Sequence, residues 1–142
     1  KCEKPSKDEA FDETLKLIRH LITNESIAPG QYNGIAAHKA FADALLTYEW
    51  DDNSEPYLNL MCNYKQYLDR QYAVPFFYDN GRSDLAQIYE KITALTKEMA
   101  VLIPQDFSAG DMFSDKQKLK PYCGILLQIC NLEEQVVELL NA

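Results

Sequence analysis

The hydrophobic positions of this chain recur every three to four residues, which is the period of an amphipathic helix. No stretch keeps the period of two that a half-buried strand requires. The expected helices cover Lys7–Thr23, Gly34–Trp50, Pro56–Ala73, Ser83–Leu102 and a last segment from Ser114 to about Asn141. The pattern therefore predicts an all-α protein, a single domain over residues 1–142 with about five helices in an up-and-down bundle.

Polar and proline residues mark the expected helix ends. Ser6 and Glu9 have the spacing of a capping box, in which each side chain bonds the backbone N–H of the other residue. Ser114 begins a second such pattern before the last helix. Val74-Pro75 is expected to stop the third helix, because the residue before a proline disfavours the helical conformation. Pro121 either kinks one long last helix or restarts a second one.

Four cysteines, with no Cys-x-x-Cys pair and no histidine at zinc-ligand spacing, favour structural disulfides. They are Cys2, Cys62, Cys123 and Cys130. Cys123 and Cys130 lie two helical turns apart, about 10.5 Å along the axis, whereas a disulfide needs Cα atoms within roughly 7 Å. Each should therefore bond a distant cysteine. If the first, third and fifth helices run parallel, matching heights favour Cys2–Cys123 with Cys62–Cys130 over Cys2–Cys130 with Cys62–Cys123.

Two disulfides staple the expected bundle and imply an oxidising compartment, so we expect a secreted protein. Lys1-Cys2-Glu3 fits a mature terminus left after removal of a signal peptide, and equally an arbitrary chain start. Asn24 begins a glycosylation sequon, Asn24-Glu25-Ser26, in an expected loop. No run of eighteen apolar residues occurs, so no membrane span is expected.

Composition and charge limit the classes of partner. Hydrophobic residues make up 46% of the chain and charged residues 25%, values typical of a folded globular protein. The net charge is −8. Such a surface repels nucleic acid and anionic lipid, so we expect neither as a partner.

No pattern of residues predicts catalysis. His20 and His38 lie in no nucleophile–base or metal-binding motif, and a lone helical histidine is more often a surface or core residue than a catalyst. There is no Glu-x-x-His pair for a di-metal site, and the acidic segment Asp79–Glu90 lacks the glycine of a calcium loop. Five glycines form no phosphate-binding loop. We therefore expect no enzyme, no metal and no cofactor.

Aromatic residues supply the remaining functional signal. Tyrosine joins a large apolar ring to a polar tip, which suits interfaces, although a core can also bury the ring and leave the hydroxyl in water. The leading hypothesis is a protein that binds another macromolecule, as an effector, a cytokine-like ligand or an inhibitor. The expected contact residues lie in segment 72–78 and loop 104–113: Tyr72, Phe76, Phe77, Tyr78, Phe107, Met112 and Phe113.

A second hypothesis is a carrier that holds a small apolar ligand in a cavity between helices. The expected lining residues are Met61, Tyr64, Tyr67, Ile88 and Met99. The carrier hypothesis requires an enclosed apolar cavity, whereas a macromolecular binder requires an exposed apolar patch.

Overall fold

A computed structural model describes residues 4–23, 32–50, 54–103 and 110–142. These residues form helices without any strand, which confirms the predicted all-α class. The elements are α1 (Lys7–Thr23), α2 (Gly34–Thr47), α3 (Ser54–Leu68), the 3₁₀ turn η1 (Asp69–Tyr72), α4 (Ala73–Asp79), α5 (Ser83–Leu102), α6 (Gly110–Ser114) and α7 (Lys116–Asn141). No helix within the described ranges is both long and apolar enough to cross a membrane.

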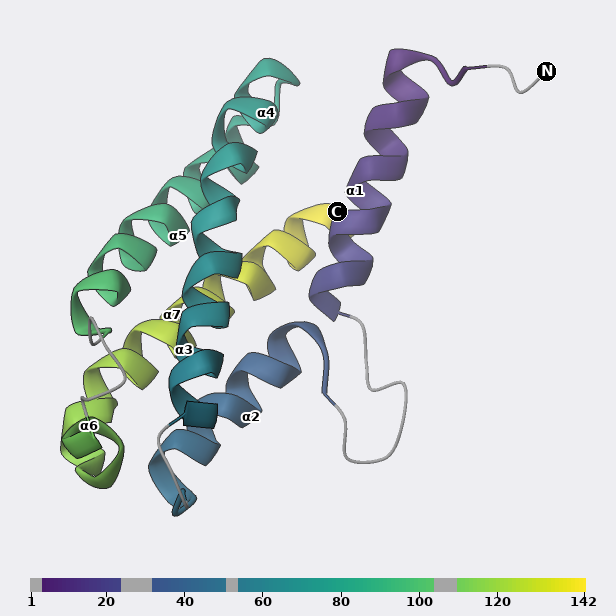
Figure 1. Cartoon of the computed structure of the whole chain (residues 1–142). Helices are drawn as coiled ribbons and strands as arrows, with labels where there is room; N and C mark the ends of the chain where they lie inside the picture. Colours follow the sequence, from purple (N-terminus) through teal and green to yellow (C-terminus); the bar gives the residue numbers. More distant parts are fainter. Residues whose placement is uncertain (1–3, 24–31, 51–53, 104–109) are drawn as a thin grey trace.

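The last helix is the centre of the core. Figure 1 shows α7 running diagonally behind α3, and α7 packs against α1, α2, α5 and α6. One face of α7 is buried at every third or fourth residue: Leu119, Tyr122, Leu126, Ile129, Glu133 and Val136. Leu45 of α2 and Ile92 and Met99 of α5 belong to the same core cluster. Each large apolar side chain buried in this way stabilises the fold by about 1.5–3 kcal/mol.

The helix ends follow the expected capping chemistry closely. The Ser6 N–H donates to Glu9 Oε2 at 2.8 Å, and the Glu9 N–H donates to Ser6 Oγ at 3.2 Å, so the capping box is confirmed. The Ser6 backbone N–H, followed by the Ser6 hydroxyl, lowers the pKa of the Glu9 carboxyl. The cap of α7 is Asp115, one residue later than predicted, and its carboxylate accepts from the Gln117 N–H at 3.0 Å. α7 continues through Pro121 without restarting.

Two predicted boundaries are wrong. α2 ends at Thr47 rather than at Trp50. The third helix ends at Leu68, and the chain passes through η1 into α4, so Val74-Pro75 does not stop a helix. Pro75 is tolerated because it lies in the first turn of α4, where a backbone N–H has no acceptor within the helix.

The predicted disulfides are absent from the structure. Cys62, Cys123 and Cys130 are free thiols, and Cys2 lies outside the described residues. Cys130 is buried beside Tyr67 on the inner face of α3, whereas Cys62 is exposed. Five residues separate Cys62 from Tyr67, which places their side chains about 140° apart around α3. The Cys123 thiol instead donates to the Ala42 carbonyl of α2 at 3.5 Å.

The first helix is attached mainly by its C-terminal end. Ile22 is the buried residue of α1, whereas Leu17 and Leu21 are 56% and 60% exposed. α2 begins at Gly34, whose φ of +54° suits glycine. A Cβ at this position would lie 2.2 Å from the Ile22 carbonyl oxygen. The absence of a side chain at Gly34 therefore lets the end of α1 rest directly on the start of α2.

Thiol reactivity tests the free cysteines. In the native protein we expect iodoacetamide to modify Cys62 quickly, because this side chain is exposed. Cys123 and Cys130 should react only after unfolding, because burial raises the pKa of each thiol to about 11 and blocks access. Mass-spectrometric mapping of the alkylated peptides is the measurement, with the protein kept under reducing conditions. Modification of Cys123 or Cys130 as fast as that of Cys62 before unfolding would contradict the structure.

Substitution at Gly34 tests the contact between α1 and α2. We expect Gly34→Ala to lower the free energy of unfolding by about 2 kcal/mol, because alanine is strained at this φ and clashes with the backbone of Ile22. Gly124→Ala is the matched control, since a Cβ there meets no atom and Gly124 lies inside α7. That change should stabilise by about 0.5–1 kcal/mol. Urea unfolding measures both, and equal effects would refute the close packing.

Candidate functional site

A carboxylate occupies one position of the buried face of α7. Glu133 is 1% exposed and accepts from Arg70 Nε of η1 at 3.1 Å. The Arg70 side chain is 31% exposed, and its Nη1 donates to the Gln66 carbonyl at 3.0 Å. Burial raises the pKa of the Glu133 carboxyl, and the positive charge of Arg70 opposes that rise. The arginine therefore reaches from the surface to neutralise a charge inside the core.

Three side chains continue this polar cluster toward α2. His38 Nδ1 is hydrogen-bonded to Asn63 Oδ1, and Asn63 Nδ2 donates to the Asn59 carbonyl at 3.0 Å. Because an amide oxygen only accepts, Nδ1 of His38 carries the proton. The ring of Tyr67 lies 4.8 Å from that of His38, with the guanidinium carbon of Arg70 5.3 Å from the Tyr67 ring centroid. Burial is the main cause of the lowered pKa of His38, which favours neutral imidazole.

The hydroxyl of Tyr67 lies at the centre of the cluster. Tyr67 is fully buried, and its hydroxyl makes no hydrogen bond of ordinary geometry. The Cys130 thiol and the Glu133 carboxylate lie near enough to affect its ionisation, and burial raises the pKa of the phenol strongly. Tyrosine, thiol and imidazole are therefore held in their uncharged forms around one ion pair.

The cluster supports a structural role better than a catalytic one. It joins α2, α3, η1 and α7 through directional bonds, which fix the relative positions of these elements. Catalysis by His38 would need a nucleophile or substrate within hydrogen-bond reach. His38 and Cys62 both line a pocket of about 380 Å³ between α2 and α3. The structure shows no hydrogen bond between these two side chains. No group of three or more His, Cys, Asp or Glu within the described ranges could hold a metal ion.

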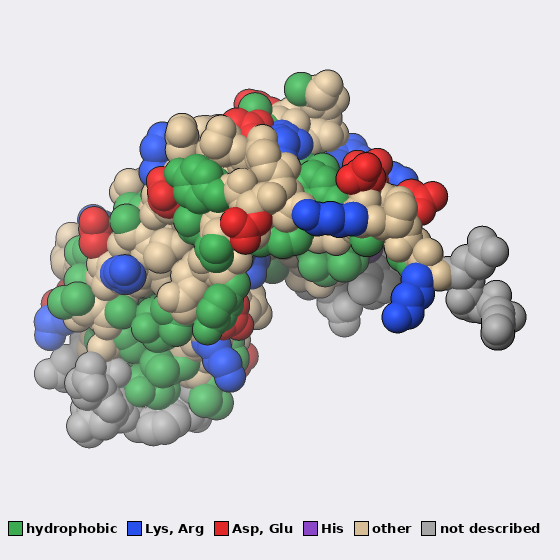
Figure 2. Space-filling model, turned by 90° about the horizontal axis from the view of Figure 1, so that it is seen from above, with side chains coloured by type: hydrophobic (Ala, Val, Ile, Leu, Met, Phe, Trp, Pro, Cys, Tyr) green, Lys and Arg blue, Asp and Glu red, His purple; other side chains and the backbone are tan. Residues whose placement is uncertain are grey.

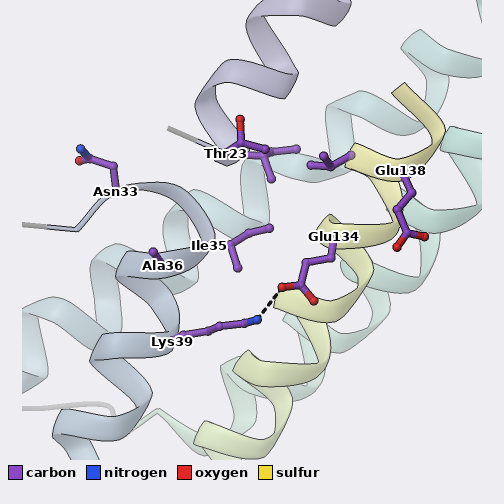
Figure 3. A pocket seen from close by; sticks show the side chains of 9 residues that line it. Thr23, Asn33, Ile35, Ala36, Lys39, Glu134 and Glu138 are labelled. Carbon is purple, nitrogen blue, oxygen red and sulfur yellow. Dashed lines mark hydrogen bonds and ion pairs between the residues drawn. The ribbon is translucent and has the colours of Figure 1, made fainter. Parts of the chain in front are cut away.

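A larger pocket lies between the end of α1, the start of α2 and the last turns of α7. Its volume is about 530 Å³. Figure 3 shows Ile35 pointing into the space between the three helices, and an ion pair between Lys39 and Glu134 at one side. Lys39 Nζ and Glu134 Oε1 are 2.5 Å apart. The pocket therefore combines an apolar centre with charged groups at its margin.

A smaller groove lies on another side of α1. Its volume is about 190 Å³, and it separates α1 from η1, α4 and α5. The lining residues are Ile18, Leu21, Ile22, Asp69, Arg70, Ala73 and Tyr89. Leu17 lies one turn before Leu21 on the same face of α1 and is exposed. Figure 2 shows the molecular surface hollowed between a broad lobe and the narrower arm that carries α1.

The predicted partner-binding residues are divided by the fold. Tyr72 and Tyr78 are exposed, whereas Phe76 is half-buried, with its ring 5.7 Å from that of Phe11. Phe77 is fully buried and stacks on Tyr89. Met112 and Phe113 are buried core residues, and Phe107 lies outside the described residues. Among the members of the set that the structure describes, Tyr72 and Tyr78 are the exposed aromatic residues.

None of the predicted ligand-binding residues lines a pocket described above. Tyr67 and Met99 are fully buried, and Ile88 is buried as part of the core cluster. Met61 is exposed on α3, and Tyr64 is half-buried. The predicted glycosylation site, Asn24, lies outside the described residues.

The sequence analysis did not predict the roles of Glu133, Leu17 or Arg70 in these sites. Glu133 lies four residues after Ile129 and three before Val136, so the spacing of the α7 stripe already places it on the buried face. Leu17 and Leu21 lie beside the buried stripe of α1, which makes the apolar face of this helix wider than the part that packs against the core. Arg70 has no comparable signal, because its role depends on how η1 approaches α7.

Removal of the buried cation tests the ion pair. We expect Arg70→Met to destabilise the protein by about 3 kcal/mol at pH 7, because a buried carboxylate is left without an opposite charge. Burial already raises the pKa of Glu133, and losing Arg70 raises it further, so the folded protein takes up a proton more readily than the unfolded chain. The loss should therefore be full above the raised pKa and shrink as the pH falls toward 4.5, the ordinary value.

The control is Arg82→Met, which breaks the partly exposed pair with Asp84 and should cost less than about 1 kcal/mol. Combining Arg70→Met with Glu133→Leu should recover stability, because no buried charge remains. Urea unfolding at several pH values measures all three variants. A double variant no more stable than Arg70→Met would contradict this account.

Comparison with known proteins identifies no relative of this chain. Neither a protein-family model, nor a curated protein, nor a solved structure matches it. The polar cluster, the pocket and the groove are therefore interpreted from their own chemistry.

Proposed function

We propose that this protein binds a partner protein by accepting an apolar helix face in the groove between α1 and η1–α4. The observation that carries the proposal is the exposure of Leu17 and Leu21, two leucines on one face of α1 beside that groove. Contiguous exposed apolar side chains on a soluble protein commonly mark an interaction site. Tyr72, a predicted contact residue, is exposed on η1 and is a third exposed apolar side chain, next in sequence to Ala73, which lines the groove.

The dimensions of the groove suit a helical partner. A groove volume of about 190 Å³ accommodates one or two large apolar anchors, as when an amphipathic helix lays its apolar face into a groove. Ile18 and Leu21 of α1, Ala73 of α4 and Tyr89 of α5 supply its apolar walls. The anchors would bury these walls from water, and such central apolar contacts carry most of the affinity of an interface.

Charge selects among helical partners. The chain carries a net charge of −8, and Asp69 lines the groove while Arg70 is occupied by Glu133. A partner helix with lysine or arginine beside its apolar face would be steered toward this surface, whereas an acidic helix would be repelled. The proposed partner is therefore a basic amphipathic helix.

A location outside the cell is also a proposal, and it rests on the sequence. Its supports are the even number of cysteines without a Cys-x-x-Cys pair, and the sequon at Asn24. The two disulfides belong to the same proposal and depend on an oxidising compartment, although the thiols described above are free. Expression in a secretory host tests it: Asn24 should carry a glycan and the mature protein should contain two disulfides. Four free thiols in the secreted protein would remove this support.

A carrier of a small apolar ligand is the second candidate. The observation that favours it is the pocket of about 530 Å³ between α1, α2 and α7, which lies within the size range of ligand sites. That pocket has a different lining from the residues predicted for a carrier, none of which is among its walls.

A peptide titration tests the proposed groove. A designed amphipathic helix with leucines on one face and lysines on the other should bind saturably, and an acidic version with the same leucines should bind less well. Leu17→Glu and Leu21→Glu should each weaken binding at least about tenfold, which corresponds to ~1.4 kcal/mol. Both residues are exposed, so stability should change little. Fluorescence anisotropy measures the affinity.

Val101→Glu is the matched control, because Val101 is 84% exposed on α5 and does not line the groove. It should leave peptide binding unchanged. Equal affinity for the acidic and basic peptides, or equal weakening by all three variants, would contradict the proposed site.

A further inference from the structure

The pocket between α2 and α3 has chemistry that neither the helix-binding proposal nor the carrier proposal uses. Its volume of about 380 Å³ is within the range of about 300–1,000 Å³ that is usual for small-molecule sites. α2 packs mainly against α7 and α1, and Figure 1 shows it inclined to α3. The space between α2 and α3 is therefore not closed by a tight helix–helix contact.

Each of the two helices presents one continuous face to this pocket. The lining residues on α2 are Gly34, Ala37, His38 and Phe41, and those on α3 are Asn59, Cys62, Asn63 and Gln66. Both sets have the spacing i, i+3, i+4 and i+7, which places their members on one side of a helix. The hydrogen bond between His38 Nδ1 and Asn63 Oδ1 shows that these two sides face each other. Asn59 and Gln66 therefore project from α3 on the side that faces α2.

The α3 wall is a row of amides. Asn63 is buried, and its amide is bonded to His38 and to the Asn59 carbonyl. Asn59 and Gln66 use their backbone carbonyls, which accept from Asn63 and Arg70, but their side-chain amides make no hydrogen bond with a described residue. Each of these amides offers two N–H donors and one carbonyl acceptor. Because Asn59 and Gln66 are two turns apart, the unoccupied amides are separated by about 10.5 Å along α3.

The α2 wall is mainly apolar and carries small side chains. Gly34 and Ala37 leave room for a ligand, and Phe41 is half-buried beside the pocket. Burial is the main cause of the lowered pKa of His38, so its imidazole is uncharged. No described lining residue is Asp, Glu, Lys or Arg. The pocket therefore offers hydrogen bonds on one side, an apolar surface on the other, and no charged side chain that would hold an ion.

We propose that this pocket binds an uncharged carbohydrate about two sugar rings long. The hydroxyl-bearing edge of the sugar lies along Asn59 and Gln66, because a hydroxyl group both donates and accepts hydrogen bonds, as an amide does. The C–H face of the rings covers Ala37 and Phe41, which removes apolar surface from water. An extended disaccharide reaches both unoccupied amides, whereas a single sugar ring reaches only one of them.

A titration with cellobiose, an extended and uncharged disaccharide, tests the site. The backbone amide resonances of Ala37 and Asn63 should shift saturably in NMR spectra at millimolar ligand. Glucose, which has one ring, should bind more weakly. Asn59→Ala and Gln66→Ala should each weaken cellobiose binding about two- to tenfold, the range of one hydrogen bond. Gln87→Ala is the matched control, because it removes an exposed amide on α5 outside the pocket, and it should leave the affinity unchanged.

Cys62 supplies a second test that needs no substitution. Its thiol is exposed and lies on the pocket face of α3 between Asn59 and Gln66. Alkylation of Cys62 with N-ethylmaleimide should therefore abolish cellobiose binding, and bound cellobiose should slow the alkylation. Cys62→Ser cannot be alkylated at this position, so N-ethylmaleimide treatment should not change the affinity of that variant for cellobiose.

Cellobiose binding that survives alkylation of Cys62, or that neither amide substitution weakens, would overturn the proposal. The same holds if no saturable shift occurs, or if adenosine, an uncharged ligand with a planar base, binds the same residues more tightly than cellobiose. The pocket shares no described lining residue with the helix-binding groove, so Leu17→Glu should bind cellobiose as the unaltered protein does.

Discussion

Burial of one face of α7 is the constraint on which the rest of the structure depends. α1, α2, α5 and α6 all pack against this helix, and its buried residues recur every three or four positions. That face is apolar except at Glu133, so the helices around it must also satisfy a charge. Arg70 does so from η1, which fixes the point where the chain leaves α3.

The polar cluster gives this fold specificity at some expense of stability. A buried ion pair seldom stabilises a protein more than well-packed apolar residues of the same volume would. The hydrogen bonds from His38 to Asn63 and from Arg70 to Glu133 instead favour one arrangement of α2, α3 and α7 over others with the same hydrophobic contacts. Because His38 and Cys130 are held uncharged, this arrangement adds no further buried charge.

Local sequence predicted the helices well and their tertiary contacts poorly. Hydrophobic periodicity placed α1 and α5 correctly, and the Ser6–Glu9 capping box marked the start of α1. Both signals act within one or two helical turns. The predicted disulfide pairing assumed parallel neighbouring helices, and the structure does not support it, because the described cysteines are free thiols and Cys62 is exposed while Cys130 is buried. Phe77 and Phe113 were expected on the surface because aromatic residues suit interfaces equally well as cores, and only the fold decides between these roles.

The weak attachment of α1 has a consequence for local stability. Ile22 is its only buried residue and contributes about 1.5–3 kcal/mol, while Leu15 and Ile18 pack against the core only in part. The face of α7, in contrast, is released only when the whole core opens. Backbone amides in α1 should therefore exchange with solvent deuterium through a local opening of small free energy, while those of α5 and α7 exchange only through global unfolding. The surfaces on both sides of α1 thus belong to the least stable cooperative unit of the molecule, where a bound helix or ligand could add the most order.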